Sequence, residues 1–146
     1  MKISIASDHG GFGLKEDLRA WLTGQGHEVV DFGCHGKESC DYPDFAGPAA
    51  RAAASGECER GIVICTTGIG VSMTANKVKG VRCALCADPW SAEMTRRHND
   101  ANMLGLGAGC VGPLMARQIV EAFLSWEFEG GRHQRRIDKI AAAENR

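Results

Sequence analysis

The sequence of 146 residues has few aromatic residues, few prolines and no excess of charge of either sign. Aromatic side chains make up 6% of it and there are four prolines, whereas 44% of the residues are hydrophobic, which excludes a disordered or collagen-like chain. No apolar run approaches the ~18 residues of a membrane-spanning helix, so we expect no membrane association. The formal net charge is −1, which does not favour a nucleic-acid partner, because general nucleic-acid binders are usually basic.

The seven cysteines are an odd number, and the stretch from Met1 to Ser7 is too short for a signal peptide. We therefore expect free thiols and a cytoplasmic location, since a disulfide framework belongs to exported chains. The length is that of one domain, and we expect a single domain over residues 1–146. A chain of this size buries a core without needing disulfides or metals.

Short aliphatic runs alternate with helical patterns along the chain. The predicted strands cover residues 2–6, 28–32, 61–65, 81–86 and 103–106. The predicted helices lie around residues 14–22, over 49–55, from Pro89, from Pro113, after Gly131, and in a short segment after the third strand. The strands alternate little in polarity, as strands buried on both faces do. This order predicts an α/β fold, a three-layer α/β/α Rossmann-like sandwich with a five-stranded parallel sheet.

Ligands of such sheets bind outside the carboxyl ends of the strands. The first predicted strand is followed there by Asp8 and His9, and the third ends at Cys65 before the segment Thr66–Gly70. Glycines between a strand and a short helix let backbone N–H groups point at an anion. The dinucleotide fingerprint is incomplete because position 73 is Met, and a P-loop is absent. The segment is interpreted as a cradle for a phosphate or a developing oxyanion, with a tight turn that binds nothing as the alternative.

Cys65 and His98 are the candidate proton-transfer groups. Cys65 opens the glycine cradle, where backbone donors favour a thiolate that acts as nucleophile or general base. A small buried hydrophobe is the alternative for this cysteine. His98 offers a proton donor near neutral pH beside the Asn99 amide, which can orient a hydroxyl.

Cys83 and Cys86 form a Cys-x-x-Cys motif within the fourth predicted strand. Residues three apart in a strand point to opposite faces, so a redox pair is not the leading interpretation. No second such pair completes a zinc site, and no metal site is expected. Cys34, His35 and Cys40 are interpreted as incidental loop residues.

The last predicted helix carries arginines near its start. Positive side chains there oppose the helix dipole, which is unfavourable unless an anion is bound. Arg132 and Arg136 are four residues apart and share a helix face, so they are interpreted as a clamp for one phosphate group. A solvated basic face is the alternative.

Several segments, taken together and in this order, resemble the ribose-5-phosphate isomerase B family, which also includes allose-6-phosphate isomerase and galactose-6-phosphate isomerase subunits. The resemblance runs from about residue 2 to residue 140. The segments that carry it are Ser7–Phe12, Asp41–Asp44, Gly68–Ser72 with Ala75–Lys77, His98–Asn102, and Glu129–His133.

The resemblance implies interconversion of ribose 5-phosphate and ribulose 5-phosphate without a metal or other cofactor. Cys65 matches the base that moves a proton between C1 and C2 through an enediolate. His98 matches the group that assists ring opening, and Thr67 lies where a helper hydroxyl is expected. The matched substrate-binding positions are Asp8, His9, Thr66, Gly68, Ile69, Gly70, Asn99, Arg132, His133 and Arg136.

The family resemblance also implies a homodimer, or a dimer of such dimers, with sites built from both subunits. The helix from about residue 131 is accordingly expected to contact the partner subunit. Two positions depart from the family: Thr66 follows the cysteine where Gly is usual, and Gly109 stands where many members carry an Arg that contacts the phosphate. The open alternatives are the same chemistry on allose 6-phosphate, galactose 6-phosphate or a tetrose phosphate, a non-catalytic sugar-phosphate-binding module, and a thiol redox protein.

Overall fold

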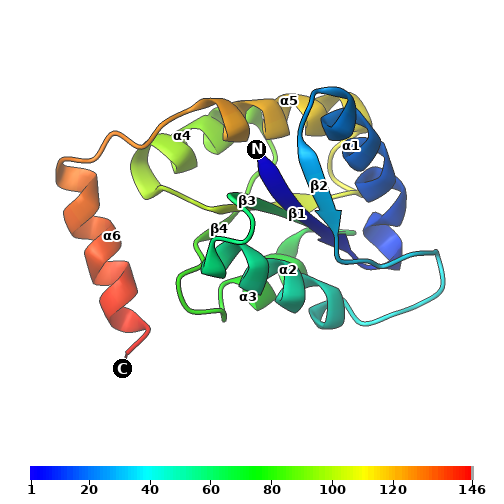
Figure 1. The fold of residues 1–146 in the computed structure, drawn as a ribbon, viewed down its shortest axis with the longest axis horizontal. Helices are drawn as coiled ribbons and strands as arrows, with labels where there is room; N and C mark the ends of the chain where they lie inside the picture. Colours follow the sequence, from blue (N-terminus) through cyan, green and yellow to red (C-terminus); the bar gives the residue numbers. More distant parts are fainter. Residues whose placement is uncertain (146) are drawn as a thin grey trace.

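The computed structural model describes residues 1–145, which form one five-stranded sheet with helices on both faces (Figure 1). The strand order is β2-β1-β3-β5-β4 and every pairing is parallel. The strands are β1 Lys2–Ser7, β2 Glu28–Asp31, β3 Arg60–Cys65, β4 Cys83–Leu85 and β5 Met103–Gly107. The predicted α/β/α sandwich is therefore confirmed.

The helices follow the predicted alternation with one clear difference. They are α1 Phe12–Gly24, α2 Pro43–Ser55, α3 Ile69–Ala75, α4 Pro89–Asn99, α5 Pro113–Ser125 and α6 Arg132–Ala143, with a short 3-10 turn at His9–Gly11. Asp88 caps α4 as its position before Pro89 predicts, accepting the Ser91 N–H at 2.7 Å. Helix α2 begins at Pro43, earlier than the predicted residue 49, because Pro43 occupies the first turn, where its missing N–H needs no partner. None of the helices formed by residues 1–145 combines the length and apolar character that a membrane crossing requires.

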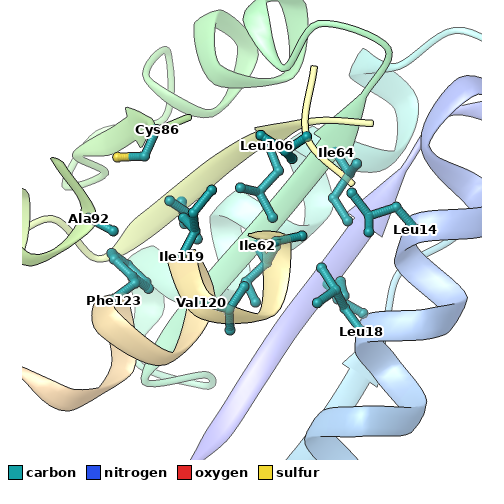
Figure 2. Packing of buried hydrophobic residues seen from close by; sticks show 14 of the residues in the cluster. Leu14, Leu18, Ile62, Ile64, Cys86, Ala92, Leu106, Ile119, Val120 and Phe123 are labelled. Carbon is teal, nitrogen blue, oxygen red and sulfur yellow. The ribbon is translucent and has the colours of Figure 1, made fainter. Parts of the chain in front are cut away.

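Two apolar layers enclose the sheet. On one face, alternate residues such as Ile62, Ile64 and Leu106 pack against α1, α4 and α5, as Figure 2 shows. On the other face, Val63 and Cys65 pack against α2 and α3. This alternation places every second residue of β3 on the α2 and α3 side, and Cys65 is the last of them.

The Cys-x-x-Cys motif is split between these two layers. Cys86 belongs to the layer of α4 and α5, whereas Cys83 packs against the layer of α2 and α3. Burial raises the pKa of Cys83 to about 12 and that of Cys86 to about 11. Both are protonated at neutral pH, and they lie in opposite layers, as their spacing within a strand predicts.

Helix α6 lies beside the sandwich, beyond α4, and belongs to neither layer (Figure 1). Its buried side chains are His133 and Ile137, while Ile140 is half exposed. Its far end is held by the Gly80 N–H, which donates to the Glu144 carboxylate at 3.2 Å. Because α6 buries only the side chains of His133 and Ile137, most of the surface of this amphipathic helix is exposed.

A buried ion pair joins α1 to the end of β2. Lys15 is fully buried, and its ammonium donates to Asp31 at 2.7 Å and to Glu16 at 2.9 Å. Hydrogen bonds from Arg19 and Lys15 lower the pKa of Glu16 to about 2. Asp31 also accepts the Gly33 N–H at 2.9 Å, so this carboxylate fixes the chain as it leaves β2.

We expect Asp31→Ala to lower the free energy of unfolding by about 3 kcal/mol, because it leaves the Lys15 charge buried with one partner fewer. Urea unfolding measures this change. The matched control is Glu28→Ala, which removes the exposed pair with Lys2 at 3.9 Å and is expected to change stability by less than about 1 kcal/mol. Equal losses in the two variants would show that the Lys15 network does not stabilise the fold.

Candidate active site

Cys65 lies at the carboxyl end of β3 with its sulfur held by the following turn. Its side chain is buried, and Sγ accepts a hydrogen bond from the Gly68 N–H at 3.1 Å. Gly68 has φ +78°, and a Cβ there would lie 2.8 Å from the Leu106 backbone, so this turn requires glycine. The sulfur is the acceptor in this bond, a role that a thiolate fills better than a thiol.

The threonines after Cys65 line the same turn. Thr67 Oγ1 accepts the Ile69 N–H at 3.2 Å and lies 4.0 Å from the Cys65 sulfur. The side chain of Thr66 lies against Gly10, where a Cβ would overlap its Oγ1. Close packing of two loops from neighbouring strands thus brings the end of β1 against the cradle.

Asp8 reaches the same place from the end of β1. Its side chain is buried, and Oδ1 caps the turn after it by accepting the Gly11 N–H at 3.1 Å. A cleft of about 400 Å³ opens at this edge of the sheet, lined by Asp8, Tyr42, Cys65, Thr66, Thr67, Ile69, Gly70 and Met73. We call Asp8, Cys65 and the segment Thr66–Gly70 the thiol half-site. The structure therefore brings together this part of the predicted site.

Tyr42 lines the cleft and lies outside the set of predicted site residues. Its ring lies on Gly70, where a Cβ would approach the ring to 2.5 Å. The available signal was its place in the segment Asp41–Asp44, together with its being the single tyrosine of the chain.

His9 lies at the same edge but outside the cleft lining. Its ring is exposed, and Nδ1 accepts the Cys40 N–H at 3.2 Å. The loop that carries Cys34 and Cys40 therefore touches the turn after β1, so Cys40 has a contact that its interpretation as an incidental residue did not include. The other ring nitrogen of His9 is the one available to a ligand.

His98 and Asn99 lie at the opposite end of the strands from Cys65, at the edge of the sheet formed by the amino ends of the strands. Helix α4 starts at the carboxyl end of β4 and runs back to the amino end of β5, so its last residues are His98 and Asn99. Cys65 pairs with Gly107, at the other end of β5, which puts on the order of 13 Å of strand between the two edges. Within one chain, these side chains do not converge with the thiol.

His98 instead meets the start of α6. The rings of His98 and His133 stack with centroids 4.3 Å apart and planes 11° from parallel. Burial lowers the pKa of His133, and the neighbouring His98 and Arg132 lower it further. His133 is therefore neutral at neutral pH.

Arg132 and Arg136 are exposed on the first turns of α6, beside this histidine stack. Within residues 1–145, no carboxylate lies at ion-pair distance from either guanidinium, whereas Arg97 pairs with both Glu93 and Glu129. We call His98, Asn99, Arg132, His133 and Arg136 the arginine half-site. Its two unpaired cations are available to an anion.

Gly109 lies beside the thiol half-site and not beside Arg132 and Arg136. Its N–H donates to the Thr66 carbonyl at 2.8 Å, and a Cβ there would lie 3.1 Å from the same oxygen. A side chain at this position therefore requires Thr66 to shift by a few tenths of an ångström.

The chain is similar to known proteins in both its sequence and its fold. The sequence profile of the family described as Ribose/Galactose Isomerase matches residues 3–140. The chain is 46% identical to ribose-5-phosphate isomerase B of Escherichia coli, over 99% of this chain and 97% of that protein. It superposes on the ribose-5-phosphate isomerase B of Clostridium thermocellum with a TM-score of 0.98, 54% identity, and coverage of 99% and 98% of the two chains. For the Mycoplasma genitalium ribose-5-phosphate isomerase B with bound ribulose-5-phosphate, the TM-score is 0.94, the identity 44%, and the coverage 99% and 96%.

Proposed function

The chain belongs to the Ribose/Galactose Isomerase family, and from this premise we propose that it interconverts ribose 5-phosphate and ribulose 5-phosphate. The observation that carries the proposal is the Cys65 sulfur, held by the Gly68 N–H at 3.1 Å in a cleft lined by backbone donors and hydroxyls. Relatives with 46% and 54% identity over nearly the whole chain bear the same name, which supports this substrate.

Cys65 is the proposed base of the isomerisation. The thiolate takes the proton from C2 of the open-chain aldose, the C–H electron pair forms a C1–C2 double bond, and the carbonyl electrons move to O1. The proton on O2 passes to O1 with the Thr67 hydroxyl as relay, and the thiol returns its proton to C1. Backbone N–H groups of the segment Thr66–Gly70 that do not already bond Cys65 or Thr67 stabilise the enediolate oxygen. The proposed route uses no metal or other cofactor.

The arginine half-site supplies the remaining roles in this proposal. Arg132 and Arg136 bind the phosphate, with His133 beside them, and thereby position C1 and C2. His98 assists opening of the sugar ring by proton transfer to the ring oxygen, and Asn99 orients a hydroxyl.

Residues at the carboxyl ends of the strands, where Cys65 lies, are proposed to make the remaining contacts to the sugar. We propose that Asp8 and His9 bind sugar hydroxyls, because both follow β1 at the edge where Cys65 lies. With the arginine half-site they would hold the two ends of one substrate.

A homodimer, alone or paired as a dimer of dimers, joins the two half-sites in this proposal. Each chain carries the thiol half-site at one edge of its sheet and the arginine half-site at the other, so a second copy is needed to bring one of each together. The weakly attached α6, with Ile140 half exposed, is the proposed contact with the partner. In this proposal, residues 1–146 are one domain located in the cytoplasm, where the seven free thiols would stay reduced.

Turnover of ribose 5-phosphate by the purified protein in EDTA tests the proposed activity, read as ribulose 5-phosphate formation. We expect kcat/KM to be higher for ribose 5-phosphate than for allose 6-phosphate, galactose 6-phosphate or a tetrose phosphate. A higher value for one of these other sugars would reassign the substrate. Calorimetric binding of a sugar phosphate with no turnover of any of them would leave a non-catalytic binding module.

Gly109→Arg is expected to lower KM for ribose 5-phosphate about tenfold with little change in kcat, because a charged hydrogen bond to the phosphate adds about 1.5 kcal/mol of binding. Steady-state kinetics at low ionic strength measures this effect. Gly109→Gln is the control, since it adds a comparable side chain without the charge. An equal change of KM in both variants would place the phosphate away from this position.

A further inference from the structure

The contact between the end of α4 and the start of α6 contains a group of possible metal ligands. His98, Glu129 and His133 each present one ligand atom, and these atoms all lie within 4.8 Å of one another. We infer that these side chains bind a divalent transition-metal ion of the Zn²⁺ or Co²⁺ type. Two imidazoles and one carboxylate, with water in the fourth position, form a donor set that such ions accept.

The distances are close to those of a bound ion. Glu129 Oε2 lies 3.9 Å from His98 Nε2 and 3.7 Å from His133 Nε2. Ligand atoms around a tetrahedral ion with bonds of about 2.05 Å are roughly 3.4 Å apart, so these two pairs must approach by roughly half an ångström. The rings must also tilt out of their parallel stack, and His98, about a third exposed, lies at the solvent side where it can turn.

His133 supplies an independent observation that points to a ligand. Its side chain is 94% buried, and within the described chain its Nε2 has no hydrogen-bond partner. A buried polar atom without a partner is unfavourable by about 1–3 kcal/mol. The free Nε2 lies 3.7 Å from the Glu129 carboxylate oxygen and is the ligand atom that His133 offers to the group.

Glu129 is oriented for the same purpose. Its Oε1 accepts a hydrogen bond from Arg97 Nε at 2.6 Å, and its N–H donates to the Arg97 carbonyl at 3.0 Å. The Arg97 guanidinium is itself held by Glu93 at 2.7 Å and lies over the Trp126 ring. These contacts occupy one carboxylate oxygen and leave the other facing the two imidazoles. Residues that surround a metal site commonly orient its ligands by hydrogen bonds of this kind.

An ion pair between Glu129 and a charged histidine explains the cluster less well. The distances of 3.7 and 3.9 Å are too long for hydrogen bonds between the carboxylate and either ring. The nearby Arg132 repels a cation, so we expect an exchangeable ion with micromolar affinity rather than a permanently bound one.

The ion would also control activity, a consequence that rests on the proposed function. A metal on His98 occupies a ring nitrogen of the histidine that is proposed to transfer a proton during ring opening. Metal binding is therefore expected to inhibit turnover of the cyclic sugar, and EDTA is expected to reverse the inhibition.

Cobalt titration of the EDTA-treated and desalted protein tests the site without reference to turnover. We expect a visible d–d absorption band to develop with one Co²⁺ per chain, and Zn²⁺ to displace it. Glu129→Gln and His98→Asn are each expected to weaken binding at least about tenfold. Both side chains are partly exposed, so these variants keep the buried His133 in place; circular dichroism checks their fold.

His35→Asn is the matched control. His35 also lies near a carboxylate, 4.0 Å from Asp31, but it does not belong to a group of three possible metal ligands. It is expected to leave the cobalt band unchanged. A band dominated by near-ultraviolet sulfur-to-cobalt charge transfer, or equal binding by the Glu129→Gln and His98→Asn variants, would overturn the inference. A cobalt band without turnover of ribose 5-phosphate would support the metal site and contradict only the proposed activity.

Discussion

Cys65→Ala is expected to lower kcat for ribose 5-phosphate by about a thousandfold and to leave KM within a few-fold of the unaltered protein, since general base catalysis contributes about 10²–10⁴-fold. The methyl group cannot accept the C2 proton, whereas the phosphate contacts proposed for Arg132 and Arg136 are untouched. Steady-state kinetics of ribulose 5-phosphate formation measures both constants.

Cys110→Ala is the control for this experiment. Cys110 is exposed at the same edge, with its sulfur 4.0 Å from the Thr66 carbonyl, but it does not line the cleft. We expect it to keep nearly full activity. Retention of activity by Cys65→Ala, or an equal loss in Cys110→Ala, would show that the Cys65 thiol is not the base.

Mixing two inactive variants is expected to restore activity. Cys65→Ala removes the base and His98→Asn removes the ring-opening group, and the structure puts these residues at opposite edges of one sheet. In a homodimer with shared sites, a mixed pair of chains contains one site with both groups intact. Random exchange of equal amounts makes half of the dimers mixed, so about a quarter of the unaltered activity should return.

The measurement is turnover before and after subunit exchange under mild denaturant followed by dilution. Each variant exchanged with itself is the control and should stay inactive. Absence of recovery, in a sample where exchange is demonstrated by mass-tagged chains, would mean that both groups act within one chain. The proposed dimeric site would then be wrong even if the isomerase activity itself is correct.

The strands could be predicted because their aliphatic runs are short and continuous. Residues 61–65 carry no polar side chain and end at a glycine-containing turn, and β3 indeed covers Arg60–Cys65. The boundaries of α2 and β4 were less accurate. Pro48 lies inside α2, and β4 spans Cys83–Leu85 within the longer predicted run, because strand pairing and not composition sets where a strand ends.

The thiol half-site could also be predicted, since the carboxyl ends of parallel strands share one edge. Asp8 directly follows β1 and Cys65 is the last residue of the neighbouring strand β3. Their closeness therefore follows from the predicted sheet. Tyr42 was missed because it belongs to a long loop whose path across the sheet has no periodic signal. The contact between His9 and Cys40 depends on the same loop.

Local order along the chain was thus enough for the fold class, the glycine turn at Gly68 and the thiol that it holds, because each depends on neighbours in sequence. The separation of His98 from Cys65 depends on something else. A helix that connects parallel strands must cross the whole sheet, so the residues at its end lie at the far edge from those at its beginning. The stack of His98 on His133 likewise needs α6 to fold back against α4, a contact between segments that no pattern in either one specifies.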